Sequence, residues 1–124
     1  MLAKKLTAVV LVGALLLLFS GCIQPSTSKG PYADGEYHGE APGHGGPLKV
    51  KVTIVDGRIS EIDIIEHHES PDEKWPDSGR ARVLIPQRVL TRQSTEGIDV
   101  VSKATGTSLT ILKAVSEALQ RARK

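Results

Sequence analysis

A pair of strands joined by a tight turn is the sequence feature that most limits what this chain can fold into. Aliphatic residues alternate with polar ones across residues 48–54, which is the two-residue period of a strand with one buried face. Asp56 and Gly57 form the sequence signature of a type I′ turn, and residues 58–66 supply the return strand. The isoleucine spacing at residues 59–62 breaks the alternation and predicts a twist or β-bulge. The sequence therefore predicts an antiparallel hairpin that must bury one face.

Residues on either side of the hairpin predict a further strand and two loops. Residues 34–40 are typical of an edge strand, with Tyr37 facing the core. Residues 41–47 are rich in glycine and predict a loop. The polar stretch at residues 67–79 contains prolines and predicts a second loop.

Apolar residues recur at helical spacing in two later segments. Residues 81–93 predict a helix, with Pro86 at its start or in its first turn. A short extended segment follows at residues 98–101, and residues 108–123 predict a terminal helix. This order predicts an α+β fold, a small antiparallel sheet with a central Asp-Gly hairpin and two helices packed on its buried face.

The first part of the chain has the organisation of an export signal. Two lysines precede an apolar run at residues 6–19, which is too short for a comfortable membrane span. The run leads into Phe-Ser-Gly-Cys at residues 19–22, which resembles the lipobox of bacterial lipoproteins, although Leu is usual at the position of Phe19. We therefore expect residues 1–22 to be a lipoprotein-type signal peptide and Cys22 to be lipidated. An uncleaved signal anchor with an incidental cysteine is the alternative.

Composition limits the domain organisation and the class of partner. Residues 23–31 predict a polar tether, which leaves residues 32–124 for one domain. The chain has 16 Lys and Arg against 14 Asp and Glu, and two of the lysines belong to the signal, so the mature charge is balanced. A balanced charge argues against a nucleic-acid-binding surface, and none is predicted. Cys22 is the only cysteine, so no disulfide can form within the chain.

Hydroxyl side chains crowd the start of the terminal helix, at Ser102, Thr105, Thr107 and Ser108. The first N–H groups of a helix lack partners and carry partial positive charge, so hydroxyls placed there either cap the helix or hold a phosphate. Asp99 lies three residues before Ser102, where its carboxylate could position a hydroxyl. From the residues alone, a cap made by Thr107 or Ser108 and a phosphate site both stay open.

Five short motifs follow one another along the domain. They are Asp34-Gly35-x-Tyr37-x-Gly39, Gly43-His44-Gly45-Gly46, the Asp-Gly hairpin, His67-His68-Glu69-Ser70, and Asp99-x-x-Ser102-Lys103-Ala104-Thr105-x-Thr107-Ser108. With these motifs the chain resembles the FMN-binding domain family. That family includes the flavin-bearing subunits of the Rnf complex and of sodium-translocating NADH:quinone oxidoreductase, and many small bacterial lipoproteins. The resemblance covers essentially the whole predicted domain and implies FMN as the cofactor.

The resemblance also implies how FMN is held. Thr105 would carry FMN through a phosphoester bond that a separate flavin transferase installs. The helix amides, with Thr107 and Ser108, would then bind the phosphate oxygens. Lys103 stands where Gly is usual in the family. If the position needs a positive φ, the Lys103 backbone is strained there. The Lys103 ammonium group could instead neutralise the phosphate. This difference leaves open an alternative in which the same fold binds FMN reversibly.

Other polar residues are assigned to the same cofactor site. Glu69 and Ser70 are expected to hydrogen-bond the polar edge of the isoalloxazine ring. The neighbouring histidines could suggest zinc, but His67 and His68 are adjacent and would point to opposite sides of a strand, so no metal site is predicted. Trp75 is expected to pack, to act as a lid or to stack on the ligand. The remaining candidate cofactor-binding residues are His68, Asp99, Ser102 and Ala104.

These features lead us to expect a membrane-anchored FMN-binding protein on the extracytoplasmic face of the cell membrane. It would transfer electrons to or from a redox partner protein or a membrane quinone-linked complex, with the flavin supplying the chemistry. The sequence offers no general acid or nucleophile of its own, which favours a carrier or complex component over a stand-alone enzyme. A lipoprotein that binds a partner or the cell wall without flavin is the remaining alternative.

Overall fold

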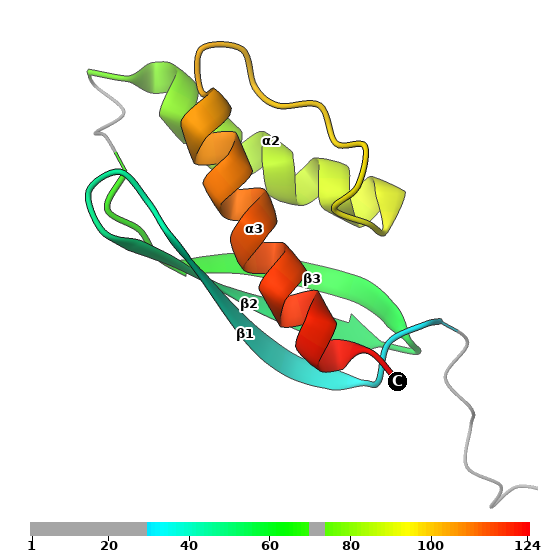
Figure 1. The fold of residues 1–124 in the computed structure, drawn as a ribbon. Coiled ribbons are helices and arrows are strands. Elements are labelled where there is room, and N and C mark those ends of the chain that lie inside the picture. The colour runs from blue at the N-terminus through cyan, green and yellow to red at the C-terminus, as the bar shows by residue number, and fades with distance from the viewer. Residues whose placement is uncertain (1–29, 70–73) are drawn as a thin grey trace, which may run out of the picture.

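A computed structural model describes residues 30–69 and 74–124 of the chain. The expected signal peptide, Cys22 and nearly all of the tether lie outside the described residues, as does Ser70, so the predicted domain boundaries stay predictions. The described elements are three strands followed by two helices (Figure 1): β1 (Gly35–Pro42), β2 (Pro47–Val55), β3 (Arg58–Glu66), α2 (Pro76–Arg92) and α3 (Thr105–Ala122). The predicted α+β class is confirmed. Within residues 30–69 and 74–124, no helix is long and apolar enough to cross a membrane.

The three strands form one antiparallel sheet in the order β1-β2-β3. Every second side chain of β2 is buried, from Leu48 to Ile54, as the alternation predicts. The pairing of β2 with β3 shifts register, because Thr53 pairs with Glu61 while Ile54 pairs with Ile59. This irregularity is the predicted bulge, and it increases the local twist of the sheet.

The opening Asp-Gly-x-Tyr-x-Gly motif supports the fold at the hairpin end of the sheet. The Asp34 carboxylate accepts hydrogen bonds from the amides of Asp56 (3.1 Å) and Gly57 (2.8 Å), the two central residues of the hairpin turn. The half-buried Tyr37 packs against the core and its hydroxyl donates to the carbonyl of Ala33 (2.8 Å). These contacts hold the start of β1 against the hairpin turn, so the motif stabilises the fold.

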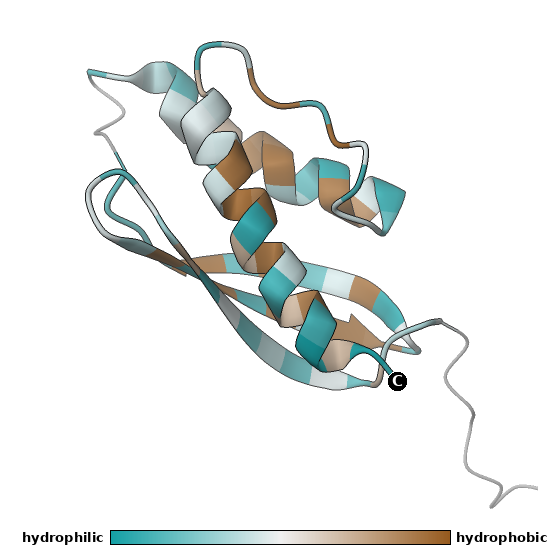
Figure 2. Cartoon of the chain, in the orientation of Figure 1, coloured by the Kyte–Doolittle hydropathy of each residue, from teal (hydrophilic) through white to brown (hydrophobic). Residues whose placement is uncertain are grey.

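Both helices lie on one face of the sheet (Figure 1). Helix α3 packs on β1 and β2, and α2 packs on β3 and on α3. A Cβ at Gly39 would collide with the Ala114 carbonyl and lie 2.8 Å from the Ala118 amide, so glycine lets α3 approach β1 directly. Apolar segments alternate with hydrophilic ones along both helices (Figure 2). The buried residues of α3 include Ile111, Ala114, Val115, Ala118, Leu119 and Ala122.

Helix α2 differs from its predicted bounds. It begins at Pro76, five residues before the predicted start at residue 81, so Pro86 lies inside the helix rather than at its beginning. Proline is pre-organised for a first helical position, and Asp77 in the first turn is favoured by the helix dipole. The loop predicted over residues 67–79 is therefore shorter.

The C-terminal end of α2 is fixed by Gln93, which adopts the left-handed conformation (φ 61°). Its side-chain amide accepts from the Ile59 amide (2.8 Å) and donates to the carbonyls of Ile59 (2.9 Å) and Leu90 (2.8 Å). These bonds join α2 to β3. The extended segment predicted at residues 98–101 forms no strand pairing within the described chain.

Candidate functional site

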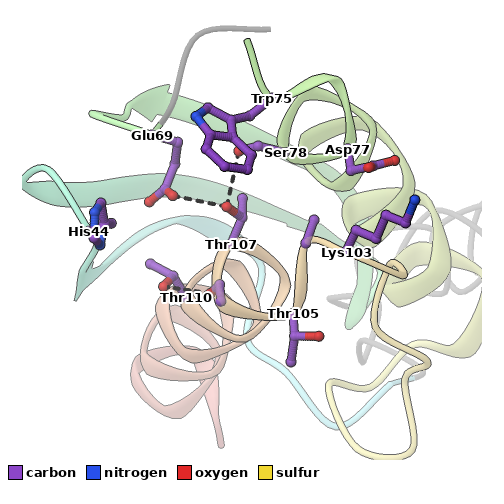
Figure 3. A pocket seen from close by; sticks show the side chains of 11 residues that line it. His44, Glu69, Trp75, Asp77, Ser78, Lys103, Thr105, Thr107 and Thr110 are labelled. Carbon is purple, nitrogen blue, oxygen red and sulfur yellow. Dashed lines mark hydrogen bonds between the residues drawn. The ribbon is translucent and has the colours of Figure 1, made fainter.

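A cavity of about 470 Å³ opens at the N-terminal end of α3 (Figure 3). This volume is within the range of small-molecule and cofactor sites. Its walls come from the glycine-rich loop after β1, the segment after β3, the first turn of α2 and the first turns of α3. The lining residues are His44, Glu69, Trp75, Asp77, Ser78, Lys103, Ala104, Thr105, Gly106, Thr107 and Thr110.

The first turn of α3 presents unpaired backbone amides to this cavity. The helix begins at Thr105, three residues before the predicted start, and its N-cap residue Ala104 makes no side-chain capping bond. The first helical bond runs from the Ser108 amide to the Ala104 carbonyl (2.9 Å). The amides of Thr105, Gly106 and Thr107 therefore have no acceptor within the helix. Such amides, with the positive end of the helix dipole, suit an anion.

The interpretation in which Thr107 or Ser108 caps the helix is wrong, because both residues lie inside it. The Ser108 hydroxyl accepts from the Val101 amide (3.0 Å) and donates to the Ala104 carbonyl (2.7 Å). Ser108 is buried and is absent from the cavity lining. It holds the preceding loop against the helix start rather than facing a ligand.

Lys103 has the positive φ that its position in the family pattern suggested. Its φ is 65°, in the left-handed region that strains residues with a Cβ. The side chain is exposed and belongs to the cavity lining, so its ammonium group adds a positive charge near the helix start. Lys103 thus combines backbone strain with a charge suited to phosphate.

Thr105 stands at the rim of the cavity as an exposed residue. Its hydroxyl points away from Glu69 and Thr107 (Figure 3), and within residues 30–69 and 74–124 it makes no hydrogen bond. The hydroxyl is therefore accessible and not committed to the fold.

Glu69 and Thr107 form the polar wall of the cavity together with Ser78 (Figure 3). The Thr107 hydroxyl donates to Glu69 Oε2 (2.9 Å) and lies 3.0 Å from Ser78 Oγ. Glu69 Oε1 is buried and has no hydrogen-bond partner among the described residues. A buried acceptor without a partner costs free energy, so this oxygen marks a place where a ligand donor would be favourable.

Glycines let the loop after β1 pack closely against the segment after β3. A Cβ at Gly43 would collide with Glu69 Oε1 and lie 2.8 Å from the Gly46 carbonyl. At Gly46 (φ 152°) a Cβ would lie 2.8 Å from the ring of His68. His68 therefore packs on the loop and does not line the cavity, whereas His44 at the loop tip does.

Five of the predicted cofactor residues meet at this cavity, and others do not. Lys103, Ala104, Thr105, Thr107 and Glu69 line it. Outside the lining lie His68, Asp99, Ser102 and Ser108, and Ser70 lies outside the described residues. The side chain of Asp99 is exposed, and its carbonyl accepts a hydrogen bond from Arg88 on α2 (2.7 Å).

Four further lining residues were not predicted from the sequence: Asp77, Ser78, Gly106 and Thr110. Asp77 and Ser78 were missed because the start of α2 was predicted too late, although Pro76 followed by an acidic residue is a helix-start signal. Within residues 30–69 and 74–124, no group of three His, Cys, Asp or Glu side chains is placed to hold a metal ion.

The fold and the cavity define a small α+β domain in which backbone amides at a helix start, suited to an anion, line a cavity. The chain belongs to the FMN-binding domain family, whose model matches residues 43–120. FMN is therefore the cofactor, and the resemblance inferred from the five motifs is confirmed. Family membership also argues against the alternative of a lipoprotein without flavin.

Two curated relatives contain a segment similar to this chain. One is an uncharacterized protein of Treponema pallidum (strain Nichols), 38% identical over 89 residues, which are 71% of this chain and 23% of that protein. The other is the NADH:acrylate oxidoreductase of Vibrio harveyi, 37% identical over 91 residues, which are 73% of this chain and 9% of that protein. The chain thus spans less than a quarter of each relative.

A solved structure shares the fold. The CPE2226 protein from Clostridium perfringens superposes with a TM-score of 0.56 at 23% identity, over 73% of this chain and 88% of that one.

The residues of the cavity fit FMN. The free amides of α3 and the Lys103 ammonium suit a phosphate. The unpartnered Glu69 Oε1 suits a ring N–H donor. These groups belong to one cavity, so a ligand with a phosphate at one end and a polar ring at the other can reach both.

Proposed function

We propose that the protein is an electron carrier anchored on the extracytoplasmic face of the membrane, with FMN joined to Thr105 by a phosphoester bond. The observation that carries the attachment is the accessible Thr105 hydroxyl, which the described fold leaves without a hydrogen bond, at the rim of the cavity beside the free amides of α3. Two other hydroxyls of the helix start are engaged, since Thr107 donates to Glu69 and Ser108 donates to Ala104, and Ser102 lies outside the cavity lining.

The attachment requires a separate flavin transferase. The Thr105 oxygen forms a bond to the FMN phosphorus of a donor in which FMN is joined to a second phosphate, the P–O bond between the two phosphates breaks, and the second phosphate leaves with the hydroxyl proton. The diester keeps one negative charge, which the dipole of α3 and the Lys103 ammonium stabilise. Because Thr105 is exposed, a transferase can reach it in the folded domain.

Bound FMN supplies the redox chemistry, and the protein supplies attachment and orientation. The electron donor or acceptor would be a redox partner protein or a membrane quinone-linked complex. The similarity to part of a protein named NADH:acrylate oxidoreductase supports a redox role. It also favours a carrier or a complex component over a stand-alone enzyme.

The geometry of the chain supports an anchor at the end of the domain opposite the cavity. Tyr32 pairs with Arg123, and the Ala33 amide donates to the Ala122 carbonyl (2.7 Å), so the tether joins the domain beside the last turn of α3. Thr105 lies at the first turn of the same helix, about 25 Å away at 1.5 Å per residue. Lipid chains on Cys22 would therefore leave the cavity free to face a partner.

The test is covalent flavin on the denatured protein. The full chain is produced together with a flavin transferase, and the flavin fluorescence of the band is measured on a denaturing gel. We expect a fluorescent band for the natural chain and for Thr105→Ser, and none for Thr105→Ala. Thr91→Ala is the matched control, because Thr91 is also an exposed helical threonine, and it should stay fluorescent. A fluorescent Thr105→Ala band would refute Thr105 as the acceptor.

Reversible binding of FMN in the same cavity is the second candidate, and the strained Lys103 favours it. A transferase that requires glycine at this left-handed position would reject the chain. In that case acid precipitation would release all of the flavin, and no variant would give a fluorescent band.

A further inference from the structure

A series of hydrogen bonds through two hydroxyl groups ends at one oxygen of the Glu69 carboxylate. Thr107 has one hydroxyl proton and donates it to Glu69 Oε2 (2.9 Å). In the contact between Ser78 and Thr107 (3.0 Å), Ser78 must therefore be the donor. Ser78 Oγ in turn accepts from Arg82 Nη1 (3.4 Å). Every donor in this relay, which consists of Arg82, Ser78, Thr107 and Glu69, points toward the carboxylate.

The relay fixes the Glu69 carboxylate by one oxygen and leaves the other with unused acceptor capacity. Oε1 is buried and has no partner in the described part of the chain. Gly43 keeps space beside it, because a Cβ there would collide with Oε1. An ionised carboxylate is an acceptor only, so the group that completes Oε1 must be a donor.

Opposite charges at the two ends of the cavity set the direction in which a ligand enters. Glu69 and His44 lie at one end, whereas Lys103 and Thr105 lie at the other (Figure 3). The second carboxylate of the lining, Asp77, lies on the Lys103 side in Figure 3, where its pairing with Arg80 (3.1 Å) offsets its charge. A phosphate beside Glu69 would meet repulsion between like charges, whereas beside Lys103 and the α3 amides it is stabilised.

We propose that Glu69 Oε1 accepts a hydrogen bond from the imide N–H of the flavin ring, and that Thr107 and Ser78 are positioning residues for this contact. The inference rests on the proposed placement of the FMN phosphate beside Thr105. Through this hydrogen bond, Glu69 selects for a flavin ring that carries an N–H donor. Thr107 and Ser78 act through Glu69 by holding Oε2.

The experiment compares FMN with 3-methyl-FMN, in which a methyl group replaces the imide hydrogen. The protein is produced without a transferase so that binding is reversible, and dissociation constants are measured from flavin fluorescence. Hydrogen bonds to charged groups correspond to about ten- to hundredfold in affinity. The natural chain should therefore bind FMN at least about tenfold more tightly than 3-methyl-FMN.

Thr107→Val keeps the shape of the side chain and removes the hydroxyl, so the discrimination should fall below about threefold, on the same scale of bond strengths. Thr107→Ser should restore it. Thr91→Val is the matched control, because the Thr91 hydroxyl likewise donates to a helical carbonyl, that of Gln87 (3.0 Å), and Thr91 lies outside the cavity lining and the relay. This variant should discriminate as the natural chain does. If Thr107→Val fails to fold, Ser78→Ala carries the same test and should lower the discrimination.

The outcomes separate this inference from the proposed function. Equal binding of the two flavins by the natural chain would overturn the role of Glu69 Oε1 while leaving FMN binding intact. Full discrimination by folded Thr107→Val, or by Ser78→Ala where that variant is used, would overturn the positioning role. If the chain binds no FMN reversibly although a transferase labels it, the ring contact is overturned, whereas a chain that neither binds FMN nor is labelled would overturn the proposed function.

Discussion

Replacing Lys103 by glycine should stabilise the domain without its cofactor. Lys103 has φ 65°, a conformation that costs a residue with a Cβ about 1–2 kcal/mol. Glycine removes this strain, but its greater conformational entropy in the unfolded chain lowers the free energy of unfolding by about 0.5–1 kcal/mol. Within the described chain, the exposed Lys103 side chain makes no hydrogen bond or ion pair that would be lost. The net expectation is a gain of about 0.5–1 kcal/mol, which for a domain of this size raises the unfolding midpoint by about 2–8 °C.

Gln93→Gly is the matched control, because Gln93 has almost the same backbone conformation (φ 61°). Its side chain, however, makes three hydrogen bonds to the backbone of Ile59 and Leu90. Losing these bonds costs about 2–4 kcal/mol, at about 0.5–1.5 kcal/mol each, which exceeds the relief of strain. We therefore expect Gln93→Gly to lose about 1–3 kcal/mol of stability.

Thermal and urea unfolding of the cofactor-free protein, followed by circular dichroism, measures both variants. Opposite signs for Lys103→Gly and Gln93→Gly are expected. A Lys103→Gly protein that is no more stable than the natural chain would refute the assignment of strain to this position. The Lys103→Gly protein should also bind FMN more weakly at low ionic strength and nearly normally at high salt. Salt screens the attraction between the Lys103 ammonium and the phosphate, which this variant lacks.

Three further substitutions test the packing and the anchor. Gly39→Ala should destabilise the domain by about 1–3 kcal/mol in urea unfolding, because its Cβ would meet the backbone of α3, and a neutral effect would contradict that close approach. Gly106→Ala should raise the melting temperature of the cofactor-free protein, since a Cβ there meets no atom within 4 Å and alanine favours the helix by about 0.5–1 kcal/mol; a lower melting temperature would contradict this. Cys22→Ala should abolish incorporation of a labelled fatty acid into the protein in its bacterial host, and labelling that persists would contradict lipidation of Cys22.

The hairpin could be predicted from the sequence because its determinants are local. Alternation in β2 and the Asp-Gly turn each specify a conformation within a few residues. Even the bulge followed from the spacing of isoleucines in β3. The glycine usual in the family at the position of Lys103 left two interpretations open, a positive φ and a charge for the phosphate, and the structure shows the positive φ.

The roles of the hydroxyl groups depend on partners that are distant in sequence. Thr107 was expected to cap a helix or hold phosphate, yet its hydroxyl donates to Glu69, 38 residues away. Ser108 supports a loop because α3 starts earlier than its apolar spacing indicates. Ser78 was not considered because the start of α2 was predicted too late, and its contact with Thr107 joins residues 29 positions apart. Residue types could therefore be predicted at the site, but the assignment of each hydroxyl to ligand or fold required the tertiary structure.

The central claim is tested most directly by peptide mass spectrometry of the full chain produced with a flavin transferase. Trypsin should release the peptide Ala104–Lys113, which contains Thr105 together with Thr107, Ser108 and Thr110. We predict that this peptide carries the mass of FMN less one water, and that fragmentation places the addition on Thr105. An unmodified peptide beside freely released FMN, or an addition on another hydroxyl, would contradict the account.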